Sequence, residues 1–437
     1  MKVMKFGGTS VGSAKMMKNV AKLISSSNKS VVVLSAMSGT TSSLIDISNY
    51  LYKNNIDGAI ETICCLKNKY HSHVEELFST KEYIEKGKEL INSVFNYLRQ
   101  FTNDIFTLKG EKIILSQGEI LSTSLMQLYL EENNINSILL SALDFMRIDK
   151  NREPDTKYIQ NKFNDILNSY PNYTIYLTQG FICRNSFGEI DNLERGGSDY
   201  TASILGGAIS AEEIQIWTDI DGMHNNDPRF VEGTIPVRNL NFDEAAELAY
   251  FGAKILHPTC ILPAKINNIP VRLLNTMEPN AQGTIISNKL EKGKIKAIAA
   301  KDNIISIKIK SGRMLLAYGF LRKVFEIFES YQTSIDMITT SEVGVAITID
   351  NNNHLNEILD DLKHYGKVSI EKNMCIICVV GDLEWHNVGY ESKIIEALKD
   401  IPLSMISYGG SNYNLSILLD SNNKINALRA LNKNLFK

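Results

Sequence analysis

The first two-thirds of the chain alternate between short apolar runs and longer segments in which apolar residues recur at helical spacing. The apolar runs lie at residues 3–6, 30–36, 135–142, 173–181, 214–220 and 269–275. Strands covered on both faces are almost continuously apolar, and their alternation with helices is typical of a parallel sheet between two helical layers. We therefore predict a three-layer α/β domain with a mostly parallel sheet over residues 1–294. The polar, helix-patterned stretch of residues 55–110 is predicted to be a helical insertion in that domain.

After residue 295 the pattern changes to short strands and helices in the order strand, helix, strand, strand, helix, strand. The same order then recurs, which predicts two ferredoxin-like βαββαβ units at residues 301–372 and 373–437. The second unit lacks its last strand. The apolar run at residues 295–300 is predicted to fill that place in the sheet.

The composition is that of an ordinary globular protein. Of 437 residues, 44% are hydrophobic and 22% are charged, and the net charge of −3 gives no reason to expect nucleic acid or an anionic membrane as partner. The chain shows neither a signal-like start nor an apolar stretch of ~20 residues, so we expect a cytoplasmic protein. The six cysteines form no disulfide-like framework, and Cys375 and Cys378 are interpreted as buried hydrophobic residues.

Glycine, hydroxyl and acidic residues collect after the predicted strands, where parallel sheets bind ligands. The stretch KFGGTS (5–10) combines a point charge at Lys5 with two glycines that let the backbone lie close to a ligand. It indicates an anion site, most simply phosphate. The structural alternative is a strand, a turn and a helix capped by Ser10 or Ser13. The chain contains neither GxxxxGK[ST] nor GxGxxG, so it has no signal for a P-loop or a Rossmann site.

Two further stretches place charged residues at predicted helix starts. In ERGGSDYTA (194–202), Arg195 can grip a carboxylate with two donors, and Ser198 or Asp199 can cap the helix that follows. In SQGEILST (116–123), Glu119 follows a glycine, and we interpret that position as a helix start. A solvated arginine and an ordinary capped helix remain the structural alternatives.

Two more stretches could serve a nucleotide. The acids and asparagines of WTDIDGMHNNDPR (217–229) suit magnesium or ribose hydroxyl groups, or simply a turn. In FGAKILHP (251–258), Lys254 stands near the end of a helix, where a solvated lysine is the common alternative.

In this order the stretches KFGGTS, LSAMSGTT, SQGEILST, TQGF…RGGSDYTA, WTDIDG…DPR and EAAELAYFGAKILHP resemble the signature series of the aspartate kinases, in the amino acid kinase family. The tail GFLRKVFEIFESYQTSIDMITTSEVGVAITID resembles their paired ACT regulatory domains. The resemblance covers essentially the whole chain. It implies transfer of the ATP γ-phosphoryl group, with Mg²⁺, to the side-chain carboxylate of L-aspartate. The product would be 4-phospho-L-aspartate, the first intermediate toward lysine, threonine and methionine.

The resemblance also implies roles for individual residues, with no residue assigned solely to the metal. The catalytic residues would be Lys5, Arg195 and Asp199. Those binding aspartate would be Ser35, Thr41, Glu119, Phe181, Arg195 and Ser198, with Glu119 on the ammonium. Those binding the nucleotide would be Lys5, Gly7, Gly8, Thr9, Thr218, Asp219, His224, Arg229 and Lys254. Two positions depart from the family pattern, which often has Tyr in place of His224 and Gly in place of Glu194.

ACT pairs in this family bind an amino-acid end product, commonly lysine, between subunits. The matching positions are Met314, Ser334, Asp336, Thr340, Ser341 and Glu342. We therefore expect a homodimer formed through the ACT domains, or a dimer of such dimers, inhibited by lysine alone or with threonine. Two alternatives stay open: a kinase of the same superfamily with a glutamate-type substrate, and a catalytically dead amino-acid sensor.

Overall fold

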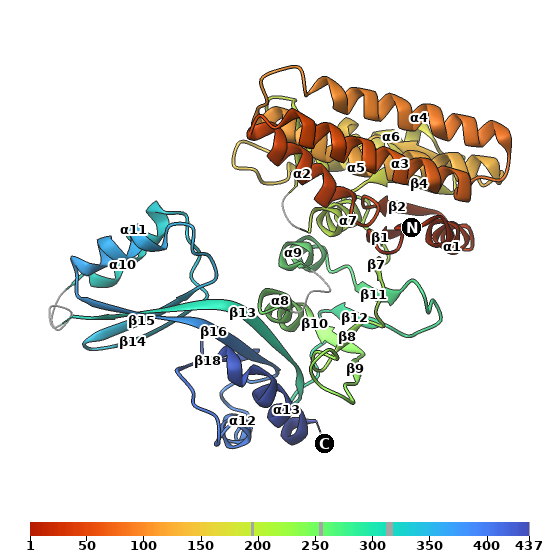
Figure 1. Ribbon diagram of the computed structural model, residues 1–437. Helices are drawn as coiled ribbons and strands as arrows, with labels where there is room; N and C mark the ends of the chain where they lie inside the picture. Colours follow the sequence, from red (N-terminus) through yellow and green to blue (C-terminus); the bar gives the residue numbers. More distant parts are fainter. Residues whose placement is uncertain (194–195, 253–256, 312–317, 437) are drawn as a thin grey trace. The chain divides into compact units, whose positions relative to one another are not determined.

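The computed structural model describes residues 1–193, 196–252, 257–311 and 318–436 (Figure 1). The chain divides into two compact units, one of residues 1–223 with 255–289 and the other of residues 224–254 with 290–437. Each unit is described here by itself. Among the described residues, no helix is both long and apolar enough to cross a membrane.

The first unit is built on a sheet with the strand order β12-β11-β7-β1-β2-β4-β3. Its strands are β1 (Lys2–Phe6), β2 (Ser30–Leu34), β3 (Ser137–Leu140), β4 (Ile175–Gln179), β7 (Ile214–Thr218), β11 (Val271–Asn275) and β12 (Thr284–Ser287). All neighbouring pairs are parallel except β11 and β12. The mostly parallel sheet is therefore confirmed. A short hairpin of β5 (Ile182–Arg184) and β6 (Ile190–Asn192) follows β4.

Helices cover this sheet on both sides, as the almost continuous burial of its strands requires. The helices are α1 (Ala14–Ser25), α2 (Thr40–Tyr52), α3 (Ile56–Leu77), α4 (Lys81–Gln100), α5 (Leu108–Glu132), α6 (Thr156–Ser169), α7 (Gly197–Ala208) and α9 (Ile261–Ile266). Helix α5 packs against β3 and β4, and α7 packs against β1, β2 and β7. Successive side chains of a strand alternate between faces. Met4 and Phe6 join the core beneath α1 and α5, whereas Lys5 lies on the face of α7.

The segment predicted as a helical insertion consists of α3, α4 and the start of α5. In Figure 1 these helices lie side by side with α2, and they share one hydrophobic core with the sheet. The buried side chains of Ile63, Tyr70, Val74 and Phe95 recur at helical spacing within it. The segment is thus part of the same folding unit as the sheet.

The second unit contains an antiparallel sheet with the strand order β14-β15-β13-β16-β18-β17. Its strands are β13 (Ile295–Lys310), β14 (Met337–Ser341), β15 (Gly344–Ile349), β16 (Lys367–Gly381), β17 (Met405–Tyr408) and β18 (Asn414–Asp420). Its helices are α10 (Phe320–Ser330), α11 (Leu355–Lys363), α12 (Tyr390–Ala397) and α13 (Lys424–Leu435). The sheet is of the predicted ACT type, with strand and helix order as expected.

Two of the expected strand boundaries are wrong. The runs at 295–300 and 304–310 form one strand, β13, and the runs at 367–372 and 374–381 form another, β16. These long strands pair with each other from Ile295 to Lys310, with a register shift near Lys301. One half of the pair lies over one hydrophobic core and the other half over a second core. The predicted unit limits at 301 and 373 therefore fall inside continuous strands.

The remaining elements of the second unit precede this sheet in the chain. They are β8 (Met223–His224), β9 (Pro236–Val237), β10 (Asn239–Asn241) and α8 (Phe242–Tyr250). Helix α8 begins with a reciprocal capping box between Asn241 and Glu244, and it packs against β16.

Candidate active site

A cavity of about 480 Å³ lies at the carboxyl ends of β1, β2 and β4 in the first unit. Its wall consists of the turns that follow these strands, one face of α5 and the first turn of α7. The lining residues are Lys5, Gly8, Thr9, Ser35, Ala36, Met37, Ser38, Gly39, Thr41, Glu119, Phe181, Gly196, Gly197, Ser198 and Asp199. The position agrees with the rule that open α/β sheets bind ligands beyond the carboxyl ends of their strands.

The cavity brings together predicted residues from five separated stretches of the chain. Residues 36–39 also line it, and the sequence reasoning assigned them no role. They lie within the motif LSAMSGTT, directly after β2, so their place at a strand end was the available signal. Arg195, the other residue predicted to bind the substrate carboxylate, lies outside the described residues.

Lys5 provides a cation at the floor of the cavity. Its Nζ atom is 2.5 Å from Oδ1 of Asp199 in the first turn of α7. The two side chains are only 11% and 14% exposed, so this pair is screened less than a surface ion pair. Lys5 reaches this position because it points to the α7 face of β1.

The two glycines after β1 serve different purposes. A Cβ at Gly8 would stand 2.9 Å from the carbonyl oxygen of Ala36, so only glycine lets the two turns approach this closely. The Gly7 amide donates to the carbonyl of Trp217 at 3.3 Å, and Gly7 does not line the cavity. The expected helix cap after this turn is Ser13, whose hydroxyl group accepts from the Met16 amide at 3.3 Å.

Glu119 provides a buried carboxylate at the cavity wall. Its Oε1 accepts a hydrogen bond from the Ala36 amide at 3.1 Å, whereas Oε2 is buried without a partner. Burial raises the pKa of Glu119 to about 8, although the Ala36 amide and the charge of Lys5 favour the ionised form. The expectation that Glu119 begins a helix is wrong. Helix α5 begins at Leu108, so Glu119 is held by a helix interior and not by a helix dipole.

The first turn of α7 presents backbone amides to the cavity. Its N-cap is Gly196 with φ of 80°, so the expected capping by Ser198 or Asp199 is wrong. Both side chains lie inside the first turn and line the cavity. The helix end has no side-chain cap. It therefore leaves amide donors and the positive end of the helix dipole available to an anion.

Phe181 closes one side of the cavity with a strained backbone. Its φ of 65° lies in the left-handed region, which is rare for a bulky residue. The Phe181 amide donates to the hydroxyl group of Thr201 at 3.1 Å, which holds it against α7. Gly180 and Gly197 allow this contact, because a Cβ on Gly180 would collide with Ser198 and one on Gly197 with Phe181. Such strain is often retained at ligand sites.

Thr218 and Asp219, predicted to bind nucleotide, lie at the carboxyl end of β7 in the first unit. The Thr218 hydroxyl donates to Asp219 Oδ1 at 3.0 Å. Neither residue lines the cavity described above. Lys254, from the same predicted group, lies outside the described residues.

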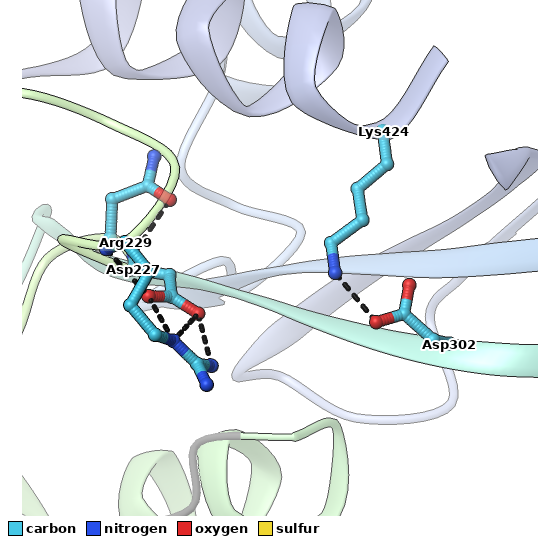
Figure 2. Close-up of polar contacts among 5 residues, drawn as sticks. Asp227, Arg229, Asp302 and Lys424 are labelled. Carbon is cyan, nitrogen blue, oxygen red and sulfur yellow. Dashed lines mark hydrogen bonds and ion pairs between the residues drawn. The ribbon is translucent and has the colours of Figure 1, made fainter. Parts of the chain in front are cut away.

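His224 and Arg229 belong to the second unit. The His224 Nδ1 atom is 3.0 Å from the hydroxyl group of Thr234. Arg229 forms a two-pronged ion pair with Asp227, at 2.9 and 3.1 Å from Nε and 2.6 Å from a terminal nitrogen (Figure 2). Burial would raise the pKa of Asp227, but the hydrogen bonds from Arg229 outweigh it and the pKa is lowered. Arg229 therefore has a carboxylate partner in this conformer.

The predicted effector residues lie around β14, an edge strand of the second unit. Ser334, Thr340, Ser341 and Glu342 are exposed, and Met314 lies outside the described residues. Asp336 differs, because its side chain is only 1% exposed.

The Asp336 carboxylate is already bound within the second unit. Its Oδ1 lies 2.6 Å from Nζ of Lys301 and accepts from the hydroxyl group of Tyr250 at 3.0 Å, while Oδ2 is buried without a partner. Burial raises the pKa of Asp336 against the opposing effect of Lys301. An effector ammonium would have to use Oδ2 or replace Lys301.

Comparison with known proteins agrees with this arrangement. The model of the "Amino acid kinase family" matches residues 1–275, and an "ACT domain" model matches residues 377–435. The chain is 34% identical to aspartokinase 1, chloroplastic, of Arabidopsis thaliana, over 100% of this chain and 80% of that protein. It is 32% identical to lysine-sensitive aspartokinase 3 of Escherichia coli (strain K12), over 100% of this chain and 99% of that protein.

The fold comparison gives the same result. The structure matches E. coli aspartokinase III in complex with aspartate and ADP (R-state) with a TM-score of 0.89, at 31% identity and over 100% of both chains. This likeness extends through both the parallel sheet and the ACT-type sheet. The chain therefore belongs to the amino acid kinase family, among its aspartokinases.

Proposed function

We propose that the chain transfers the γ-phosphoryl group of ATP to the side-chain carboxylate of L-aspartate, giving 4-phospho-L-aspartate and ADP. The observation that carries this proposal is the pairing of opposite charges in one cavity. Lys5 and the amino end of α7 suit carboxylate and phosphate, whereas buried Glu119 suits an ammonium. Aspartate has both kinds of group. The solved relative from E. coli binds aspartate and ADP.

In this proposal the substrate is held at its ammonium and at one carboxylate, and its carbon chain lies against a wall. The α-ammonium pairs with Glu119, whose Oε2 has no partner within the chain. One carboxylate binds the Ser198 hydroxyl group and the amide donors of α7, together with Arg195. Ser35, Thr41 and Phe181 complete the wall around the carbon chain. Such positioning holds the aspartate carboxylate next to the ATP phosphates, so the reaction no longer depends on a chance encounter of two anions in solution.

Phosphoryl transfer depends mainly on positioning and on neutralising charge, and we assign those tasks to the residues after β1. Lys5 meets the charge of the transferring group, and the backbone of Gly8 and Thr9 lies along the phosphates. Asp199 orients Lys5 through their ion pair. Gly7 supports the turn. By resemblance to the family, the residues assigned to the rest of the nucleotide are Thr218, Asp219, His224, Arg229 and Lys254.

We assign Mg²⁺ to Asp199, whose carboxylate lines the cavity beside Lys5. Among the described residues no group of three or more His, Cys, Asp and Glu side chains is placed to hold a metal ion. Mg²⁺ usually needs no such cage, since one or two carboxylates and the substrate phosphates suffice. When bound, the ion would neutralise part of the phosphate charge.

We propose that the protein is a cytoplasmic homodimer, or a dimer of such dimers. Lysine inhibits the enzyme by binding at the ACT-type sheet. The E. coli relative carries the name lysine-sensitive. The residues assigned to the effector are Met314, Ser334, Asp336, Thr340, Ser341 and Glu342. Lysine offers two ammonium groups, which suit the carboxylates of Asp336 and Glu342.

The test is a hydroxylamine-trapping assay with ATP, Mg²⁺ and L-aspartate, with L-glutamate as the competing acceptor. Lys5→Met should lower kcat by ~10²–10³, the usual effect of removing one contact to a developing charge. Lys2→Met is the matched control, because Lys2 lies on the same strand and pairs with Glu213 away from the cavity. Equal trapping with glutamate would favour the glutamate-type alternative. No trapping by the wild-type chain would favour a sensor without catalysis.

A further inference from the structure

Two consecutive residues of α3 hold the turn that follows β2. The Nζ atom of Lys69 donates to the carbonyl oxygen of Ser38 at 2.8 Å. The hydroxyl group of Tyr70 is 2.9 Å from that of Thr40, and the Tyr70 side chain is fully buried. Helix α3 belongs to the helical insertion, so this insertion reaches the wall of the active-site cavity.

The turn held in this way joins β2 to α2 and belongs to neither a strand nor a helix. Residues 35–39 all line the cavity, and Gly39 stands at the start of α2 with φ of 80° and no side-chain cap. Several contacts fix the rest of the turn. The Ser35 amide donates to the Phe6 carbonyl and the Ser35 carbonyl accepts from Ser122, while the Ala36 amide donates to Glu119 and the Ser38 amide to the Gly8 carbonyl at 3.1 Å. The Ser38 carbonyl points the other way, toward α3.

Lys69 lies beside this wall but not in it. A Cβ built on Gly39 would stand 3.5 Å from the Lys69 Nζ atom, while Lys69 itself is not among the lining residues. Its ammonium therefore acts on the cavity through the backbone of Ser38 and Gly39. A hydrogen bond from a charged donor is stronger than one between neutral groups.

We propose that Lys69 is a positioning residue of the substrate site, which fixes the turn of residues 35–39 against Glu119 and Gly8. The proposal rests on the assignment of this cavity to aspartate. In this proposal the helical insertion not only covers the sheet but also supports the wall of the substrate site. Loss of the contact leaves the Ser38 carbonyl without the Lys69 ammonium. This disturbs the part of the cavity wall formed by Ser35, Ala36 and Thr41.

The experiment compares Lys69→Met, Lys69→Arg and Lys18→Met in steady-state kinetics. Lys18, on α1, donates to the carbonyl of Glu76 on α3 at 2.8 Å. It makes the same kind of bond, from a lysine ammonium to a backbone carbonyl, away from the cavity. Lys69→Met should raise KM for aspartate about threefold to tenfold, the effect of losing one hydrogen bond, with kcat within about twofold. Lys69→Arg should restore KM, and Lys18→Met should leave it unchanged.

Amide hydrogen exchange provides a second readout. In Lys69→Met the amides of residues 36–39 should exchange faster, while those of β1 and β2 keep wild-type rates. An unchanged KM for Lys69→Met, or an equal rise for Lys18→Met, would overturn the inference. Failure of the wild-type chain to phosphorylate aspartate would instead overturn the proposed function on which it rests.

Discussion

Glu119 shows how one buried side chain can combine a structural cost with the binding role that we propose for it. Its carboxylate lies in the interior of α5, accepts one amide hydrogen bond and leaves Oε2 without a partner. An ionised carboxylate in such a place is poorly solvated, so its pKa rises to about 8. An ammonium bound beside it would favour the ionised form. Binding of aspartate below pH 8 should therefore release a proton.

The raised pKa of Glu119 predicts a specific pH dependence of stability. The folded state holds the proton more tightly than the unfolded state, whose pKa is near 4.5. The stabilisation from this group is therefore complete below pH 4.5 and is lost as the pH rises toward 8. The free energy of unfolding of wild type should fall relative to Glu119→Gln over this range, by at most ~5 kcal/mol. Denaturant unfolding of both proteins at several pH values measures this difference in unfolding free energy.

The control for this prediction is Glu131→Gln, which changes an exposed carboxylate on the same helix. Its difference from wild type in unfolding free energy is the baseline against which the pH-dependent difference of Glu119→Gln is compared. Parallel curves for Glu119→Gln would show that Glu119 titrates normally in the folded chain.

At the scale of elements, close approaches between backbones build the site. Helix α5 passes so near the turn after β2 that a Cβ on Gly118 would stand 2.8 Å from that of Ala36. This approach places the Glu119 carboxylate at the Ala36 amide. The glycine before Glu119 marks a contact between a helix and a turn, and not a helix start as its position suggested.

Gly118→Ala should therefore impair the site more than the fold. The added methyl group gains about 1 kcal/mol of helix propensity but pushes Ala36 outward, so KM for aspartate should rise. Gly87→Ala is the matched control, because Gly87 also lies in a helix, α4, where its Cβ would stand 2.9 Å from Phe78. Thermal unfolding of both variants measures the effect on stability, and steady-state kinetics measures the effect on KM for aspartate. An equal effect of both on KM would show that general loss of packing explains it.

At the scale of the whole molecule, the ACT-type sheet is organised by two long strands. Strands β13 and β16 pair along both repeats, and each repeat packs its own helices against its own core. Strand β14 is an edge strand of this sheet, and it lies close to β17, the strand at the other edge. The exposed residues Thr340, Ser341 and Glu342 lie at the end of this edge.

If lysine binds between two subunits, as we propose, it must stabilise the dimer, because binding and association are linked. Sedimentation of the dilute protein should show a larger dimer fraction with millimolar lysine, and the same lysine should lower activity. Glu342→Ala should weaken both responses together, while norleucine, which lacks the ε-ammonium, should cause neither. A dimer fraction that does not respond to lysine would show that the effector site does not lie at the subunit interface.

The sequence by itself determined the order of strands and helices, the parallel sheet, the repeated ACT-type unit and the strand ends at which the cavity lies, although it assigned no role to residues 36–39. These follow from local apolar periodicity and from the rule that ligands bind at the carboxyl ends of parallel strands. Only the tertiary structure decided that Glu119 is buried inside a helix, that Gly196 caps α7, and that Lys69 contacts Ser38. The contacts of Glu119 and Lys69 depend on segments that meet across tens of residues of chain, and no local pattern encodes that meeting.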